Sequence, residues 1–221
     1  MSDHVLRIAH RGAPLHRREN TIASVLSAFE RGADLVEVDV KVTADGIPVV
    51  LHDHTLHRLW DLDAAVTDLP LAQLPGRDLP LPQRLPTLDE LLDAVQGALL
   101  LDLPSTLEAG AVLAQNVHCL AVTGDPEALA LVRAARPDAM IALSWDEPGL
   151  PDDTWIRRVR PDFVNRPHEL VDATEVEAIV TRGSRCSTYT VDTEARVREL
   201  RGAGVHAIIS NDIDMLARVL S

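Results

Sequence analysis

Three short clusters in the first part of the chain carry side chains suited to acid–base or metal chemistry. The first is His10-Arg11-Gly12, which follows an apolar run. Histidine transfers protons near neutral pH, arginine binds phosphate oxygens with paired donors, and glycine permits the tight turn that aims both. A tripeptide this short occurs often by chance, so its meaning depends on the other two clusters.

The second cluster, Glu37-Val38-Asp39-Val40-Lys41, lies in a strand-like run. Side chains alternate along a strand, so Glu37, Asp39 and Lys41 share one face and the valines share the other. Two buried carboxylates are costly unless a cation neutralises them, and carboxylate oxygens favour Mg²⁺ or Ca²⁺ over zinc. The alternative is a solvated face of an edge strand, with Lys41 beside a turn.

The third cluster, His52-Asp53-His54, ends a Val-Val-Leu run. It allows three interpretations: His52 as a proton carrier, a zinc site that includes both histidines, or histidines at the surface. The other histidines lack such a context, and we expect them to be structural or exposed.

The elements that must position these clusters follow a βα pattern, because short β-branched runs alternate with amphipathic stretches. The predicted strands are Val5–Ala9, Asp34–Val42, Leu99–Leu103, His118–Val122, Met140–Ser144, Phe163–Asn165, Cys186–Thr190 and His206–Ser210. The predicted helices are Thr21–Arg31, Leu88–Ala94, Leu107–Gln115, Pro126–Ala135, Ala173–Arg182, Thr193–Ala203 and Ile213–Val219. This α/β pattern predicts one (β/α)8 barrel domain over residues 1–221, with His10 in a catalytic loop after the first strand.

One connection differs from the βα pattern. Thr43-Ala44-Asp45-Gly46 joins the second strand to the apolar run 47–51 across a gap too short for a parallel crossover, and Asp-Gly is typical of a hairpin. A turn near Ala44–Asp45 would bring His52 back beside Glu37. The proline-rich segment 53–86 excludes a long helix and predicts a folded-back loop insertion, either a lid over the site or ordinary decoration of the barrel.

The composition limits the partners. The net charge is −13. Binding to nucleic acid or to an anionic membrane requires a basic surface, so we expect neither as a partner. A phosphate substrate must therefore be bound by a metal or by a few arginines, because Lys41 is the chain's one lysine. No apolar run is long enough for a membrane span and no signal sequence precedes the first strand, so we expect a cytoplasmic protein without stable membrane insertion. Cys119 and Cys186 are expected to be reduced core thiols.

The order and spacing of the clusters resemble the glycerophosphodiester phosphodiesterase family, whose fold is the phospholipase C-like phosphodiesterase TIM barrel. The stretches that carry the resemblance are Ile8-Ala9-His10-Arg11-Gly12, Glu19-Asn20-Thr21, residues 32–40, Thr43-Ala44-Asp45-Gly46, Pro48-Val49-Val50-Leu51-His52-Asp53, Leu56-His57-Arg58 and Leu85-Pro86-Thr87-Leu88-Asp89-Glu90. Looser similarity continues through Phe163-Val164-Asn165, residues 188–192 and residues 204–211. The resemblance therefore spans essentially the whole chain.

The resemblance implies hydrolysis of glycerophosphodiesters to sn-glycerol 3-phosphate and an alcohol. It assigns one divalent cation, Mg²⁺ or Ca²⁺, to Glu37, Asp39 and Asp102. It assigns acid–base catalysis to His10 and His52, with the glycerol 2-hydroxyl attacking phosphorus to give a cyclic phosphate that water opens. Arg11 is expected to bind the phosphate.

The second half departs from the family pattern in three places. Asp102-Leu103-Pro104 stands where the family has Glu-x-Lys, so the usual lysine is lost and Lys41 is the candidate to replace its charge at the substrate. Tyr189 replaces a tryptophan as a substrate-binding residue, and Ser210-Asn211 replaces Thr-Asp.

Two alternatives remain at the level of the sequence. A zinc amidohydrolase-like barrel would use His10, His52 and His54, although the first cluster lacks the second histidine of the usual early His-x-His. A degenerate barrel would bind phosphodiesters without turnover, which the lost lysine favours and the two intact histidines oppose.

Overall fold

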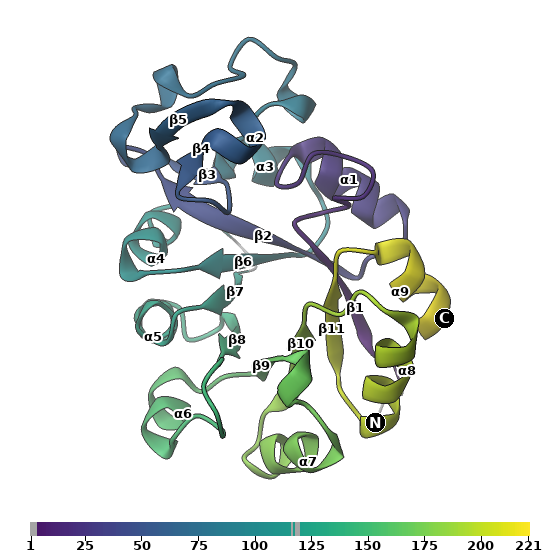
Figure 1. Cartoon of the computed structure of the whole chain (residues 1–221). Helices are drawn as coiled ribbons and strands as arrows, with labels where there is room; N and C mark the ends of the chain where they lie inside the picture. Colours follow the sequence, from purple (N-terminus) through teal and green to yellow (C-terminus); the bar gives the residue numbers. More distant parts are fainter. Residues whose placement is uncertain (1–3, 116, 118–119) are drawn as a thin grey trace.

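The computed structural model describes residues 4–115, 117 and 120–221. In this part of the chain eight parallel strands close into a barrel, because β1 pairs with β11 on one side and with β2 on the other (Figure 1). Around the barrel the strands are β1 (Leu6–His10), β2 (Leu35–Val42), β6 (Leu99–Leu103), β7 (Ala121–Gly124), β8 (Met140–Ser144), β9 (Phe163–Pro167), β10 (Arg185–Tyr189) and β11 (Ala207–Ser210). The predicted α/β barrel is confirmed.

Helices cover the outside of this barrel. They are α1 (Ile22–Glu30), α3 (Leu88–Ala94), α4 (Thr106–Leu113), α5 (Pro126–Ala135), α6 (Asp153–Val159), α7 (Ala173–Thr181), α8 (Glu194–Ala203) and α9 (Ile213–Leu220). Side-chain caps begin several of them, for example Thr21 for α1 and Asp125 for α5. Each connecting helix brings the chain back to the start of the next parallel strand, so all eight strands end on the same side of the barrel.

Alternation along the strands divides the apolar side chains into two cores. Val36, Val38 and Val40 of β2 belong to the large outer core between barrel and helices. Leu35 belongs to a smaller inner core inside the barrel. The members of that inner core are Ile8, Leu35, Leu100, Ala121, Ala142, Phe163, Ala207 and Ile209. Residues two positions beyond these share the inward face, so the next layer of side chains also lies inside the barrel.

The predicted hairpin after the second barrel strand is present. Strand β3 (Pro48–Val50) pairs antiparallel with β2 in the register Val40↔Val50 and Val42↔Pro48. Thr43 Oγ1 donates to Asp45 Oδ1 across the turn, and Gly46 adopts φ 80°. Leu51 N then donates to Asp39 O, which fixes the chain leading to His52 beside the strand that carries Glu37 and Asp39.

Residues 53–86 form an insertion without a long helix, as predicted. It contains β4 (Thr55–Leu56), α2 (His57–Trp60), β5 (Leu62–Ala65) and single 3-10 turns at Val66–Asp68, Leu71–Gln73 and Leu81–Gln83. A separate apolar cluster that includes Leu56, Val66 and Leu85 packs the insertion against β3. In Figure 1 it lies beside β2 and β3 at one edge of the barrel.

The structure differs from the sequence-based expectations at one strand and one helix. The predicted strand His118–Val122 falls partly outside the described residues, and β7 runs from Ala121 to Gly124. Helix α6 was missed, although Asp152 caps it and Trp155, Ile156 and Val159 contribute to the outer core. The dense prolines before it and the arginines on its outer face hid that pattern.

Cys186 is a buried free thiol, and burial raises its pKa to about 12. Cys119 lies outside the described residues. Among the residues described, no helix has the length and apolar character required to cross a membrane.

Candidate active site

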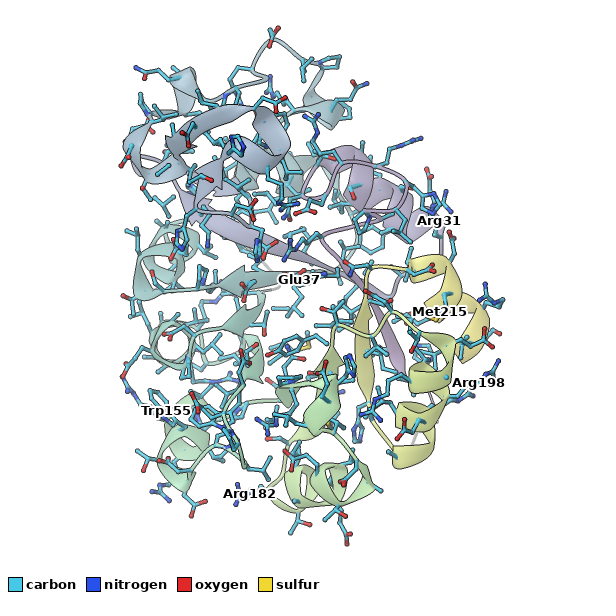
Figure 2. The ribbon with its side chains drawn as sticks, viewed as in Figure 1. Arg31, Glu37, Trp155, Arg182, Arg198 and Met215 are labelled. Carbon is cyan, nitrogen blue, oxygen red and sulfur yellow. The ribbon has the colours of Figure 1, made fainter. Side chains whose placement is uncertain are left out.

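A layer of polar side chains stands above the inner apolar core, at the carboxyl ends of the barrel strands. His10 lies two residues after Ile8, Glu37 two after Leu35, and Asp102 two after Leu100, so all three point inward. Thr123, Ser144 and Asn165 repeat the same relation on β7, β8 and β9. Figure 2 shows Glu37 inside the ring of strands, whereas Arg182 and Arg198 lie at its periphery.

The strand register brings the first clusters together. His10 is paired with Glu37 between β1 and β2, and Asp39 is paired with Asp102 between β2 and β6. His10 Nε2 is 3.9 Å from Glu37 Oε2. Glu37 and Asp39 are each only 4% exposed. The alternative of a solvated edge-strand face is therefore wrong.

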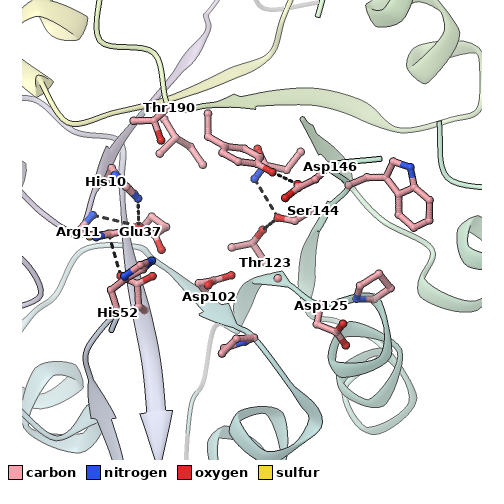
Figure 3. A pocket seen from close by; sticks show the side chains of 18 of the residues that line it. His10, Arg11, Glu37, His52, Asp102, Thr123, Asp125, Ser144, Asp146 and Thr190 are labelled. Atoms are coloured by element: carbon pink, nitrogen blue, oxygen red, sulfur yellow. Dashed lines mark hydrogen bonds and ion pairs between the residues drawn. The ribbon is translucent and has the colours of Figure 1, made fainter. Parts of the chain in front are cut away.

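These residues line a pocket of about 820 Å³. Its walls include His10, Arg11, Glu37, Asp39, His52, Asp102, Pro104, Thr123, Asp125, Ser144, Asp146, Asn165 and Tyr189. Figure 3 shows His10, Arg11, Glu37 and His52 gathered on one side, with Asp125 and Asp146 on the other. None of the described lining residues comes from 53–86, so the insertion is not a lid in this conformation.

Arg11 is held in an unusual backbone conformation that directs it to the carboxylates. It has φ 57°, and Gly12 follows with φ 91°, where an added Cβ would lie 2.3 Å from Ser24 Oγ. The Arg11 N–H donates to Glu37 Oε2, and its Nη1 donates to Glu19 Oε1 at 3.0 Å. Arg11 Nε lies 3.3 Å from Asp39 Oδ2 but lacks hydrogen-bond geometry, so this buried N–H has no acceptor among the described residues.

His10 is oriented by a second residue that was not assigned a role from the sequence. Asn211 Nδ2 donates to Asp192 Oδ2 at 2.7 Å, which fixes the amide so that Oδ1 faces His10 Nδ1 at 2.8 Å. Nδ1 must therefore carry a proton, and Nε2 is the ring nitrogen directed towards Glu37. Burial, and next the charge of Arg11, lower the pKa of His10.

His52 is positioned in a similar way by its neighbour in the chain. Its Nδ1 lies 2.7 Å from Asp53 Oδ1, and a carboxylate at this distance accepts the Nδ1 proton. Its side chain is more exposed than that of His10. Both histidines therefore have Nδ1 engaged in a hydrogen bond, so Nε2 is the ring nitrogen of each that could exchange a proton with a ligand.

Two of the inward carboxylates, Glu37 and Asp102, have raised pKa values. Burial raises the pKa of Glu37 well above its usual range, and the charges of Asp39 and Asp102 add to this effect. Burial also raises the pKa of Asp102 to about 6, with Asp39 as the second cause. Because ionised carboxylates at such close spacing repel one another, the cluster is stabilised when one of them is protonated or when a cation binds.

The donor set fits a hard divalent cation by its chemistry, because Glu37, Asp39 and Asp102 supply carboxylate oxygens and no thiolate. Within residues 4–115, 117 and 120–221, however, no three His, Cys, Asp or Glu side chains already converge as a metal cluster. The fit depends on the chemistry of the donors and the raised pKa values, not on a preformed cage. His54, required for the zinc alternative, is exposed and does not line the pocket.

Lys41 is located differently from the other predicted site residues. It is 7% exposed, so it is not a solvated lysine, and it is absent from the described lining of the pocket. Among the charges that lower the pKa of Asp102, against the larger effects of burial and Asp39, Lys41 comes first. Its ammonium group therefore lies in the electrostatic environment of the carboxylates.

Tyr189 lines the opposite part of the pocket and its hydroxyl donates to Asp146. Burial, and next this hydrogen bond, raise the pKa of Tyr189. Beside it, Ser144, Thr123 and Asn165 form a hydrogen-bonded row across the barrel.

Several site residues had no assigned role at the level of the sequence. Asn20 Nδ2 donates to Asp39 Oδ2 at 2.7 Å, and Glu19 receives Arg11. Arg58 connects Glu19 with Asp53. The signal that the sequence offered for Glu19, Asn20 and Arg58 was their place in motifs that resemble the family. Their hydrogen-bond partners can be identified only in the folded structure.

An eight-stranded parallel barrel with histidine, arginine and three carboxylates at its strand ends has the architecture of a (β/α)8-barrel enzyme. A model of the Glycerophosphoryl diester phosphodiesterase family matches residues 10–215. The chain therefore belongs to that family of enzymes.

Similar proteins cover the chain to different extents. A glycerophosphodiester phosphodiesterase of Caldanaerobacter subterraneus subsp. tengcongensis is 28% identical over 244 residues, which is 97% of each protein. Glycerophosphodiester phosphodiesterase 1 of Rattus norvegicus is 42% identical over 72 residues, 33% of this chain. The aligned part of the chain spans only 22% of that rat protein's length.

Solved structures have the same fold. A phosphodiesterase from Oleispira antarctica, in complex with the product sn-glycerol-3-phosphate, superposes with a TM-score of 0.84 at 24% identity and covers 98% of this chain and 97% of its own. The glycerophosphodiester phosphodiesterase of Thermotoga maritima has a TM-score of 0.81 at 23% identity, over 99% of this chain and 100% of its own.

The crowded carboxylates lead to a prediction about stability. In chelator-treated protein near pH 7.5, Asp102→Asn should raise the free energy of unfolding by roughly 1 to 3 kcal/mol, because an ionised Asp102 with a folded pKa of about 6 is costly. Its folded pKa exceeds the ordinary value of 3.8, so the cost is full above about pH 6 and fades towards pH 4. Urea unfolding at both ends of this range measures it. An equal gain at both pH values, or a loss near pH 7.5, would contradict the assignment.

Proposed function

We propose that this chain hydrolyses glycerophosphodiesters to sn-glycerol 3-phosphate and an alcohol, using one divalent cation and two histidines. The observation that carries the proposal is the convergence of two histidines and three carboxylates on one pocket, in a chain matched by the family over residues 10–215. The histidines are His10 and His52, and the carboxylates are the buried Glu37 and Asp39 and the half-buried Asp102. A phosphodiester brings the negative charge that Arg11 can bind.

Glu37, Asp39 and Asp102 are the proposed cation ligands. Enzymes of this family typically use divalent cations, and the oxygen donors suit Mg²⁺ or Ca²⁺. The bound cation would supply positive charge against the phosphate oxygens as negative charge develops on them. Asn20 holds Asp39 through a direct hydrogen bond, and the Arg11 backbone holds Glu37, so two of the three carboxylates keep a fixed orientation.

The histidines are proposed to transfer the protons. One Nε2 takes the proton of the glycerol 2-hydroxyl as its oxygen forms a bond to phosphorus, and the other returns a proton to the alcohol oxygen as the old P–O bond breaks. The cyclic phosphate is then opened by water, which places the phosphate on the 3-position. Asn211 and Asp53 support this role because they occupy Nδ1 of His10 and of His52.

Arg11, Tyr189 and Lys41 are the proposed substrate-binding residues. Arg11 offers an N–H that lacks an acceptor within the described structure, and Tyr189 lies across the pocket from it. For Lys41 the support is the register: Asp39 pairs with Asp102, so Lys41 and Pro104, two residues further along each strand, stand at corresponding heights. The lysine of the family pattern would stand at Pro104. Lys41, on the neighbouring strand, would therefore supply a positive charge that acts on the phosphate from a distance.

The two alternative functions are supported to different degrees. The zinc amidohydrolase-like alternative loses support because His54 lies outside the pocket and the chain belongs to another family. The degenerate barrel without turnover remains the relevant alternative, and assays of turnover decide between it and the enzyme.

The proposal predicts turnover of glycerophosphodiesters in the presence of Mg²⁺ or Ca²⁺ and its loss after EDTA treatment, with recovery when either cation is added back. A panel of diesters with different alcohols, assayed for released glycerol phosphate, measures this. Full turnover after exhaustive chelation would exclude the cation. A panel without any turnover would favour the degenerate barrel.

His10→Ala and His52→Ala should each lower kcat by roughly 10²- to 10⁴-fold, because each removes a proton-transfer group. His54→Ala is the matched control, since His54 is exposed and does not line the pocket, and it should retain normal kcat. Steady-state kinetics on the best diester of the panel measures all three. Wild-type kcat in either of the first two variants would remove that histidine from the mechanism.

Lys41→Met should lower kcat by roughly tenfold, with little change in the melting temperature, if its charge serves the phosphate. Methionine keeps the length and the apolar stem of this buried side chain. Asp39→Asn, assayed in parallel, should be inactive and confirms that the assay detects losses at this strand. Unchanged kinetics in Lys41→Met would leave Arg11 and the cation as the phosphate's partners.

A further inference from the structure

We infer that Arg58, on helix α2 of the 53–86 insertion, is a positioning residue that holds His52 and Arg11 at the same time. The inference rests on the proposed function for its kinetic consequences. It gives the insertion a role that differs from both a lid and simple decoration, because the insertion supplies the group that connects two separate parts of the site.

The first arm of this connection leads to His52. Arg58 Nε donates to Asp53 Oδ2 at 2.6 Å, and Arg58 Nη2 donates to Asp53 Oδ1 at 3.1 Å. This paired contact fixes the plane of the Asp53 carboxylate, whose Oδ1 also accepts from His52 Nδ1 at 2.7 Å. Arg58 therefore fixes both the tautomer and the ring orientation of His52.

The second arm leads to Arg11. Arg58 Nη2 donates to Glu19 Oε1 at 2.6 Å and its Nη1 donates to Glu19 Oε2 at 3.1 Å. The same Oε1 accepts from Arg11 Nη1 at 3.0 Å. Glu19 thus lies between two guanidinium groups, one in the pocket wall and one in the insertion.

Charge and packing make this bridge specific. The hydrogen bond from Arg58 is the largest cause that lowers the pKa of Asp53, to about 2, and the pKa of Glu19 is also lowered by Arg58 and Arg11 against the opposing effect of burial. Both carboxylates stay ionised, and without Arg58 they would repel each other. Helix α2 is anchored because Trp60 packs on the insertion's apolar cluster, and the centroid of its ring lies 4.4 Å from the guanidinium carbon of Arg18, the neighbour of Glu19 in the chain.

The alternative hypothesis is that Arg58 forms surface ion pairs that have no effect on catalysis. The Arg58 side chain is 46% exposed, and exposed pairs contribute only about 0 to 1 kcal/mol to stability. Measurements of stability therefore do not distinguish the two hypotheses. The kinetics and the tautomer of the His52 ring do. Arg77 offers a matched control, because it lies in the same insertion and pairs with Glu90, while neither residue lines the pocket.

The test compares Arg58→Gln, Arg58→Lys and Arg77→Gln with wild type in the full chain with a divalent cation. Arg58→Gln should lower kcat by roughly 10- to 100-fold, since a small misplacement of a proton-transfer group is costly. Arg58→Lys should retain a higher kcat than Arg58→Gln, because lysine keeps the positive charge but lacks the planar guanidinium group that binds a carboxylate with two donors. Arg77→Gln should leave kcat unchanged, and all three variants should melt within a few degrees of wild type. In the His52→Ala background, Arg58→Gln should cost much less than in wild type.

A second readout does not need turnover. In substrate-free protein, ¹⁵N NMR of the imidazole should find His52 protonated at Nδ1, and Arg58→Gln should shift this to a mixture of tautomers, whereas Arg77→Gln should not. An unchanged His52 tautomer in Arg58→Gln overturns the inference, as does a kcat equal to that of Arg77→Gln. If wild type lacks turnover on every diester, the proposed function fails, and the NMR result alone decides whether Arg58 positions His52.

Discussion

The site depends on three carboxylates that the barrel encloses with too little positive charge. Glu37 and Asp39 are almost fully buried on β2, and Asp102 stands level with Asp39 on β6. Ionising all three in this environment is costly, which is why the pKa values of Glu37 and Asp102 are raised. Arg11 offsets part of the cost through its contacts with Glu37 and Asp39. The surplus negative charge is the physical basis of the proposed cation site at this end of the barrel.

Strand alternation produces this arrangement from the sequence in a direct way. The inward positions of β1, β2 and β6 carry an apolar residue first and then His10, Glu37 or Asp102 two residues later. The apolar layer fills the barrel below, so the polar layer opens only to the pocket. The hairpin then returns the chain to place His52 beside this layer, and the insertion that follows places Arg58 on the outer side of both Asp53 and Glu19.

The fold could be predicted well because the strands are short, β-branched and separated by capped helices. All strand bounds but one lie within two residues of the prediction, and Leu99–Leu103, Met140–Ser144 and the helix Leu88–Ala94 agree in full. Helix α6 was missed, since its apolar spacing is brief and lies among prolines and arginines. The inward carboxylates followed from period-two spacing, but the partners of His10 could not, because Asn211 lies 201 residues away and joins it only when the barrel closes. The burial of Lys41 likewise depends on tertiary packing that alternation does not predict.

The most direct test of the cation site is a calorimetric titration of the chelated protein with Ca²⁺ and with Mg²⁺ near pH 6, repeated in buffers of different ionisation enthalpy. Because Asp102 has a pKa of about 6 and that of Glu37 is also raised, binding of a cation must release protons. We expect one cation per chain, proton release that declines as the pH rises, and loss of binding in Asp39→Asn. Absence of binding, or binding that Asp39→Asn leaves unchanged and that releases no protons, would contradict it.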